Sequence, residues 1–306
     1  MSPLSALFLS SGDPTLDRRH EWARGLIERG ETEAAAEMLA ETLAHVPGFI
    51  AGWFLLGEAR ELLGDKEAAI AAFRRVLALD PTDRLGAGLR LARFGARNSA
   101  RAMSSAYVTN LFDQYAGRFD RELIESLRYN APTLLCAALD RVAGERRYAR
   151  VLDLGCGTGL MGEAIRDKAD DLVGVDLSKN MVAAASRKKV YDRLIVGDLM
   201  ETLAVETAPF DLVLAADVFV YVPDLKPVFA AAAPRLSAEG LFGFTIETHD
   251  DEGAILRETL RFAHGEEHLR RAAKAAALEI LRIERVSTRR EKNIPVEGLL
   301  AVLRRT

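Results

Sequence analysis

The fold of this chain is decided by one stretch, Val151-Leu152-Asp153-Leu154-Gly155-Cys156-Gly157-Thr158-Gly159. Its first four residues, three aliphatic side chains around one acid, are typical of a buried strand in a parallel sheet, which is apolar on both faces. The three glycines that follow allow positive φ angles and let backbone amides approach a ligand without a Cβ in the way. The stretch therefore predicts a strand, a tight ligand-binding turn and a helix that begins near Leu160.

Four later segments also read as short apolar strands, and each ends in an acidic residue: 171–176, 193–198, 210–217 and 240–247. Asp176 lies 21 residues after Gly155, the separation at which a strand-end carboxylate meets the ribose hydroxyls of a bound nucleoside. An acid after a strand can instead cap the next helix. That alternative stays open for each acid alone, but the joint spacing of Asp153, Asp176 and Asp198 favours a nucleoside site.

An acid two residues before a Gly-x-Gly-x-Gly turn resembles motif I of the class I S-adenosylmethionine (SAM) methyltransferases. A dinucleotide-binding fingerprint would need its third glycine where this chain has Leu160. The resemblance implies SAM as the cofactor, S-adenosylhomocysteine as the product and no metal. In that family the acid after the third strand binds the adenine amino group, and the next side chain covers the ring. The implied cofactor-binding residues are Tyr115, Asp153, Gly155, Cys156, Gly157, Gly159, Asp176, Leu177, Asp198, Leu199 and Ala215.

The end of the chain matches the same family. Residues 278–286 alternate partly as a strand, residues 294–303 offer another, and Lys292-Asn293 between them is typical of a tight hairpin turn. The resemblance implies an α/β fold with a seven-stranded, doubly wound sheet of order 3-2-1-4-5-7-6, closed by this antiparallel C-terminal hairpin. Ligands would bind at the carboxyl ends of the parallel strands.

Composition narrows the class of protein. The 306 residues suggest one large or two medium domains, and a formal charge of −4 argues against a general nucleic-acid or membrane-surface partner. No uncharged apolar run reaches the ~18 residues that a membrane-spanning helix requires. The two cysteines, Cys136 and Cys156, are far apart, and the N-terminus lacks a basic leader. We expect a cytoplasmic protein.

The first third of the chain repeats itself. Gly30, Ala35 and Pro47 recur 34 residues later as glycine, alanine and proline, at the period of the tetratricopeptide repeat. This all-α resemblance covers residues 16–94, and residues 83–94 form its expected capping helix. We expect an extension over 1–15, a repeat module over 16–100 and a methyltransferase domain over 101–306. Two repeats and a cap leave an apolar face uncovered, so the module should pack on the rest of the chain. It could also bind a partner protein or be a structural appendage without one.

Aromatic residues precede the glycine turn. Tyr107, Leu111, Tyr115 and Phe119 recur every four residues, which predicts one face of a helix and is also typical of an aromatic core stripe. The pattern Phe-Asp-x-Tyr-Ala-x-x-Phe-Asp over 112–120 resembles the N-terminal lid of small-molecule SAM methyltransferases. That resemblance implies a helical lid over 101–130, with Tyr115 against the methionine part of the cofactor.

The sequence identifies the methyl acceptor less specifically than the cofactor. The fourth strand does not end in the Asn/Asp-Pro-Pro-Tyr/Phe signature of amino-group methylation on adenine or glutamine, and no cysteine is placed to attack a pyrimidine. Carboxylate, hydroxyl, amine and carbon acceptors stay open. The candidate bases are His249 after the fifth strand, His264 in the segment expected to roof the pocket, and Asp217. Tyr221 could orient the acceptor, although an aromatic core role is the alternative.

Basic residues suggest the charge of the acceptor. Residues 280–306 carry seven Lys/Arg and three Glu, a balance of +4. If the sixth strand runs parallel to the others, its end lies on the ligand side. We therefore predict that Arg261, Arg289 and Arg290 bind an anionic acceptor or an acidic carrier protein, with solubilising charge on an edge hairpin as the alternative.

These observations predict a SAM-dependent methyltransferase that acts on an unidentified small-molecule or protein-borne acceptor. Two other functions stay open. One is a tetratricopeptide adaptor whose methyltransferase-like domain senses the cofactor. The other is a dinucleotide-dependent oxidoreductase, which Leu160 opposes.

Overall fold

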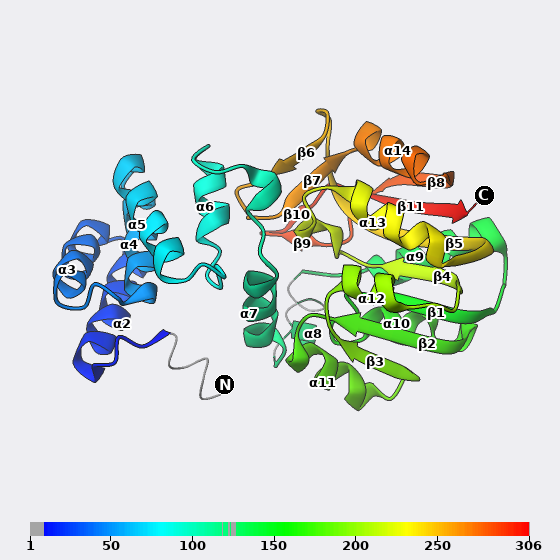
Figure 1. Cartoon of the computed structure of the whole chain (residues 1–306), viewed down its shortest axis with the longest axis horizontal. Helices are drawn as coiled ribbons and strands as arrows, with labels where there is room; N and C mark the ends of the chain where they lie inside the picture. The colour runs from blue at the N-terminus through cyan, green and yellow to red at the C-terminus, as the bar shows by residue number, and fades with distance from the viewer. Residues whose placement is uncertain (1–8, 118, 122, 124–126, 306) are drawn as a thin grey trace. The chain divides into compact units, whose positions relative to one another are not determined.

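The chain forms two compact units, Met1–Tyr107 and Val108–Thr306. The computed structural model describes residues 9–117, 119–121, 123 and 127–305. The first unit is all-helical, whereas the second is built on a large mixed sheet (Figure 1). Within the described residues, no helix is both long and apolar enough to cross a membrane.

The first unit is a series of antiparallel helices in which each helix packs against the next. They are α2 (Pro14–Glu28), α3 (Thr32–His45), α4 (Ile50–Leu62), α5 (Lys66–Leu79) and α6 (Ala87–Arg93), followed by the 3₁₀ helix η1 (Ser99–Arg101). Gly30 and Gly64 follow the first helix of each pair with φ of +82° and +75°, the left-handed conformation in which glycine ends a helix. A Cβ on Gly57 would lie 2.6 Å from Phe73, so the α4–α5 pair requires glycine there. The predicted helix-turn-helix repeats are confirmed.

The helices described ahead of the sheet of the second unit are α7 (Ser105–Tyr115), α8 (Phe119–Arg121) and α9 (Ala131–Ala143). The predicted aromatic stripe was wrong as a single helical face, because α7 ends at Tyr115 and Phe119 belongs to α8. Gly117 between them is a turn residue, and glycine disfavours continuation of a helix.

The sheet has the predicted order. Its seven main strands are β1 (Tyr148–Leu154), β2 (Ala169–Asp176), β3 (Arg193–Val196), β4 (Phe210–Ala215), β5 (Leu236–His249), β8 (Leu278–Val286) and β11 (Gly298–Arg305). They lie in the order β3-β2-β1-β4-β5-β11-β8, with β1 to β5 parallel and β11 antiparallel to both of its neighbours. The order 3-2-1-4-5-7-6 is therefore confirmed. Because β8 runs parallel to β5, its end reaches the carboxyl edge of the sheet.

Apolar side chains cover both faces of this sheet. Along β1, Leu152 and Leu154 join one core cluster while Val151 joins the other, as the two-residue period of a strand requires. The first cluster includes α12 (Leu199–Val205), α13 (Leu225–Ala232) and α14 (Glu266–Ala275), and the second includes α9 and α10 (Leu160–Ile165). The remaining connections contain α11 (Lys179–Lys188) and three 3₁₀ helices: η3 (Arg166–Lys168), η4 (Phe219–Tyr221) and η5 (Ala233–Arg235).

Two features at the end of the chain differ from the prediction. The segment around His264 was expected to be a connection that roofs the pocket, but it forms strand β7 (Phe262–Gly265). This strand pairs with β6 (Ala254–Leu256) and, in parallel, with the last three residues of β5. Lys292-Asn293 forms the expected turn with positive φ at both residues, a conformation typical of tight hairpins. It joins β9 (Arg290–Glu291) to β10 (Ile294–Pro295), however, and the last long strand begins only at Gly298.

Candidate cofactor and acceptor site

The glycine turn connects β1 to α10 at the carboxyl edge of the sheet. Gly155, Gly157 and Gly159 all have positive φ, at +64°, +52° and +93°. A Cβ on Gly155 would lie 2.6 Å from Val218, so that glycine is required for packing. A Cβ added to Gly157 would meet only one described side chain within 4 Å, the ring of Phe119 at 3.8 Å. Gly157 therefore leaves an open cradle at the centre of the turn.

Asp176 lies beside this cradle at the end of β2. Its carboxylate accepts hydrogen bonds from the backbone N–H of Gly157 at 3.0 Å and of Ser178 at 2.8 Å. Burial raises the pKa of Asp176, against the effect of these two hydrogen bonds. The structure thus brings the predicted ribose-binding carboxylate to the glycine turn, and the role itself stays a prediction.

Asp153 lies at the end of β1 with its side chain buried. Oδ2 accepts a hydrogen bond from the hydroxyl of Tyr191 at 2.6 Å, whereas Oδ1 has no partner among the described residues. Burial, with a smaller contribution from the charge of Asp176, raises the pKa of Asp153 to about 7 against the lowering effect of the Tyr191 hydrogen bond. A buried acceptor without a partner is costly unless a ligand supplies a donor. SAM fits this requirement, because its methionine end carries positive charge.

The other predicted cofactor residues lie along the same edge. Oδ1 of Asp198 accepts hydrogen bonds from the backbone N–H of Met200 and Glu201, so this acid caps α12, as the alternative interpretation held. The remaining residues are the half-buried Leu177 and Leu199 and the buried Cys156 and Ala215. Their contacts to an adenine or methionine group stay predictions.

The lid segment is attached to the loops that follow β1 and β2. On α7, a carboxylate oxygen of Asp113 accepts a hydrogen bond from the Ser178 hydroxyl at 2.6 Å, and its backbone carbonyl accepts from the Asn180 side chain at 3.0 Å. On α8, Asp120 bonds the hydroxyl of Thr158 and pairs with Lys188 at 3.0 Å. Sequence reasoning missed both acids, since only the aromatic residues of this segment suggested a role.

Aromatic rings lie between the lid and the sheet. Phe112 makes edge contacts with Phe119, at 5.8 Å between ring centroids, and with Tyr221 of η4, at 5.3 Å. Since Phe119 also borders the Gly157 cradle, these rings form a wall beside the glycine turn. Tyr115 is half-buried at the end of α7.

Asp217 follows β4 in a conformation that is uncommon for a residue other than glycine, with φ of +56°. Its carboxylate accepts hydrogen bonds from the hydroxyls of Thr245 at 2.9 Å and Thr288 at 3.0 Å, and it pairs with Arg289 at 3.0 Å. A carboxylate held by three donors is poorly placed to take a proton from an acceptor. The structure therefore favours a positioning role for Asp217 over the predicted role of base.

The arginines predicted to bind an anion already have partners within the protein. Arg289 is 4% exposed and pairs with Glu247 and with Glu291, as well as with Asp217. Arg261 pairs with the same two glutamates, and Arg290 donates to the backbone carbonyl of Asn293 at 2.6 and 3.0 Å. Acids from other parts of the unit, Asp217 and Glu247, thus take part in neutralising Arg289 and Arg261, whereas Arg290 is bonded to a backbone carbonyl.

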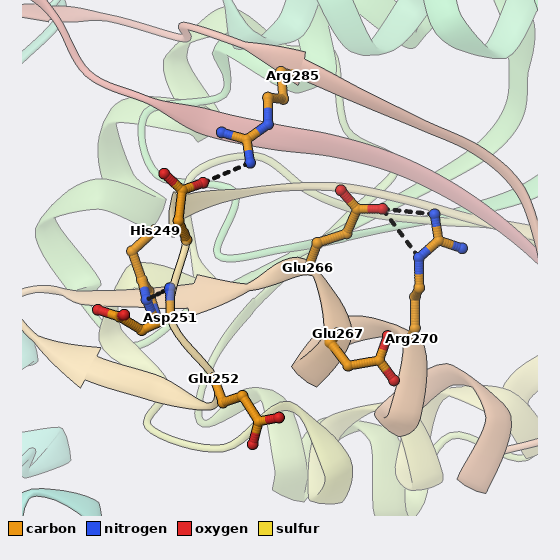
Figure 2. Close-up of a pocket in the computed structure, with 8 residues that line it drawn as sticks. His249, Asp251, Glu252, Glu266, Glu267, Arg270 and Arg285 are labelled. Atoms are coloured by element: carbon orange, nitrogen blue, oxygen red, sulfur yellow. Dashed lines mark hydrogen bonds and ion pairs between the residues drawn. The ribbon is translucent and has the colours of Figure 1, made fainter.

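His249 lies in a separate pocket of about 270 Å³ at the end of β5 (Figure 2). Its Nδ1 accepts from the backbone N–H of Asp251 at 3.1 Å, and Nε2 faces the carbonyl of Gly253 at 3.2 Å. None of the predicted cofactor-binding residues lines this pocket. The other lining residues are Asp250, Asp251, Glu252, Glu266, Glu267, Arg270 and Arg285.

His264 was predicted to lie in a segment that roofs the pocket. It lies instead in β7, where its side chain is fully buried. Its Nε2 contacts the carbonyl of Phe219 at 3.1 Å, and burial lowers its pKa to about 4. Neither histidine is therefore presented as a base in this conformation. Among the residues that the structure describes, no group of three or more His, Cys, Asp or Glu could hold a metal ion.

Comparisons with known proteins agree with this geometry. Residues 152–244 match the family described as a methyltransferase domain, and residues 20–84 match the tetratricopeptide repeat. Over 134 residues the chain is 31% identical to a malonyl-[acyl-carrier protein] O-methyltransferase of Enterobacter lignolyticus, covering 44% of this chain and 53% of that protein. Over 155 residues it is 30% identical to a ubiquinone biosynthesis O-methyltransferase of Bordetella avium, covering 45% and 63%. The chain thus spans less than two thirds of either relative.

Solved structures show the same fold. Magnesium protoporphyrin IX methyltransferase from Synechocystis PCC 6803, with bound SAM, matches with a TM-score of 0.51 at 14% identity, over 66% of this chain and 97% of that one. A 1,6-didemethyltoxoflavin-N1-methyltransferase of Burkholderia thailandensis matches with a TM-score of 0.51 at 20% identity, over 65% and 89%. The second unit therefore has the Rossmann-like fold of these methyltransferase structures, and the chain matches the methyltransferase-domain family over residues 152–244 and the tetratricopeptide repeat over residues 20–84.

Proposed function

We propose that the second unit binds SAM and transfers its methyl group to an acceptor, with release of S-adenosylhomocysteine. The observation that carries the proposal is the meeting of three features at one edge of the sheet. They are the open cradle at Gly157, the carboxylate of Asp176 and the Oδ1 atom of Asp153, which no described residue contacts by a hydrogen bond. The family match over residues 152–244 supports it.

In this proposal each group binds a different part of the cofactor. Asp176 accepts hydrogen bonds from the ribose hydroxyls, the amides of the glycine turn face the ligand, and Asp153 faces the positive methionine end. Bound SAM supplies an electrophilic methyl group on its sulfonium sulfur. The lid rings of Phe112 and Phe119 exclude water, and the unit contributes mainly proximity and orientation.

For the acceptor we propose a nucleophilic oxygen, either of a small molecule or of a group carried by a protein. Both relatives described above are O-methyltransferases, which supports this choice. The tetratricopeptide module supports a protein partner, since such repeats present extended binding surfaces. An anionic acceptor would have to compete with the internal carboxylates for Arg261 and Arg289, so the proposal leaves the charge of the acceptor open.

The test compares ligands on the full-length chain. SAM and S-adenosylhomocysteine should raise the melting temperature whereas NAD should not, because only a ligand of the native state stabilises it. A shift with NAD alone would instead favour the dinucleotide-dependent oxidoreductase. Incubation with SAM and pools of hydroxyl- and carboxyl-bearing metabolites or carrier proteins should then yield S-adenosylhomocysteine. Binding of SAM without turnover on any pool would favour the adaptor.

A further inference from the structure

Tyr191 lies outside every sequence motif, between α11 and β3, yet its ring passes between the elements that form the glycine turn. Three glycines make room for it. A Cβ would lie 3.1 Å from the Tyr191 ring at Gly159, 2.4 Å at Gly162 and 2.8 Å at Gly174. These glycines belong to the turn, to α10 and to β2. Any larger residue at Gly162 or Gly174 would therefore displace the ring.

The hydroxyl at the end of this ring meets Asp153. It donates to Oδ2 at 2.6 Å, and Oδ1 of the same carboxylate is left without a partner among the described residues. Asp153 is 1% exposed, so water does not compete freely for this hydrogen bond. The geometry thus fixes one carboxylate oxygen and leaves the other for a ligand.

We propose that Tyr191 is a positioning residue that holds the carboxylate of Asp153 for the positively charged methionine end of SAM. The inference rests on the proposed function and adds to it a residue that no motif indicated. Gly162 and Gly174 acquire a role as well, since they admit the ring. Gly159, the last glycine of the turn, leaves space for the ring of Tyr191.

The surroundings of Asp153 make this contact sensitive to pH. Burial and, to a smaller extent, the charge of Asp176 raise the pKa of Asp153, the Tyr191 hydrogen bond lowers it, and the result is a pKa of about 7. Tyr129 and Cys156 are the other titratable groups near Asp153, and burial raises the pKa of each, so both stay protonated near neutral pH. Asp153 therefore changes charge near neutral pH, and loss of the tyrosine hydroxyl should move that change to higher pH.

The experiment measures the dissociation constant of SAM for the full-length chain by calorimetry between pH 6 and pH 8.5. In the wild-type chain, SAM should bind more weakly as Asp153 becomes protonated at low pH. In Tyr191→Phe the midpoint should move to higher pH, so that affinity falls about tenfold at pH 7 and recovers toward pH 8.5. Tyr148→Phe is the matched control, because it removes the hydroxyl of a buried tyrosine at the opposite end of β1 and should change nothing.

Two more variants separate positioning from packing. Gly162→Ala keeps the hydroxyl but pushes it away from Asp153, and it should move the midpoint in the same direction. Asp153→Asn should flatten the profile. A Tyr191→Phe profile that matches the wild type, or an equal loss at every pH, overturns the proposal. If Tyr191→Phe does not fold, a pH dependence that survives in Asp153→Asn overturns it as well. A wild-type chain that binds no SAM would refute the proposed function itself.

Discussion

Replacement of Arg289 by alanine should destabilise the second unit without a specific effect on the acceptor. The arginine is 4% exposed and pairs with Asp217 at 3.0 Å and with Glu247, which is itself buried. Although burial opposes its charge, Asp217 and Glu247 hold the pKa of Arg289 above its usual value. Without the guanidinium, buried Glu247 would keep only its longer pairs with Arg257 at 3.6 Å and Arg261 at 3.9 Å. Asp217 would keep hydroxyl donors but no cation among the described residues.

The size of the effect follows from that burial. Removal of one partner of a buried ion pair costs about 3–5 kcal/mol, because the other charge is left without compensation. For a unit of this size, each kcal/mol corresponds to a shift of about 2–4 °C in melting temperature. We therefore expect a decrease of about 6–20 °C. Arg290→Ala is the matched control: it loses only bonds to the Asn293 carbonyl and should cost less than about 1 kcal/mol.

Scanning calorimetry measures the change, and fluorescence provides an internal reference. Both tryptophans, Trp22 and Trp53, lie in the first unit, so their signal follows the repeats and should be unchanged. Equal melting temperatures for Arg289→Ala and Arg290→Ala would refute the reasoning. A raised KM for an anionic acceptor in a fully stable Arg289→Ala chain would instead restore the predicted substrate role.

Three other changes have defined outcomes. Asp176→Ala should weaken SAM binding at least tenfold, because ribose hydroxyls lose a charged acceptor, and calorimetry showing unchanged affinity in a folded variant would remove Asp176 from the site. Gly157→Val should abolish SAM binding, since a branched side chain fills the cradle and disfavours φ of +52°; normal binding would mean that the cradle is not the ligand site. Burial raises the pKa of Asp83, which accepts from the N–H of Ala87 and Gly88, from 3.8 to about 6. Because the native state binds this proton more tightly, its contribution to the stability of the first unit should be lost as pH rises through about 6. Urea unfolding followed by tryptophan fluorescence should show this decline in the wild type and lose it in Asp83→Asn; identical pH profiles would contradict it.

Local pattern was enough to predict the main strands, the glycine turn and the helical repeats, whereas the order of the strands in the sheet came from the family resemblance. The run from Val151 to Gly159 specifies a buried strand and a turn that only glycine accommodates, and both depend on neighbouring residues alone. The same holds for the 34-residue repeat and for Lys292-Asn293, whose positive φ angles a tight turn requires. The position of Asp176 beside the turn follows from the spacing of one strand-helix-strand unit.

Only the tertiary structure decided which charged or polar side chains are buried and which partners they have. Arg289 and Arg290 are adjacent in sequence, but only Arg289 is enclosed with carboxylates from β5 and the β4 loop. His264 is buried because β7 pairs with β5, a contact that no local periodicity indicates. Tyr191 and Asp153 lie 38 residues apart and meet only because glycines on three different elements leave room for the ring. Backbone conformation is largely a local property, whereas burial and charge pairing depend on residues that folding brings together from distant parts of the chain.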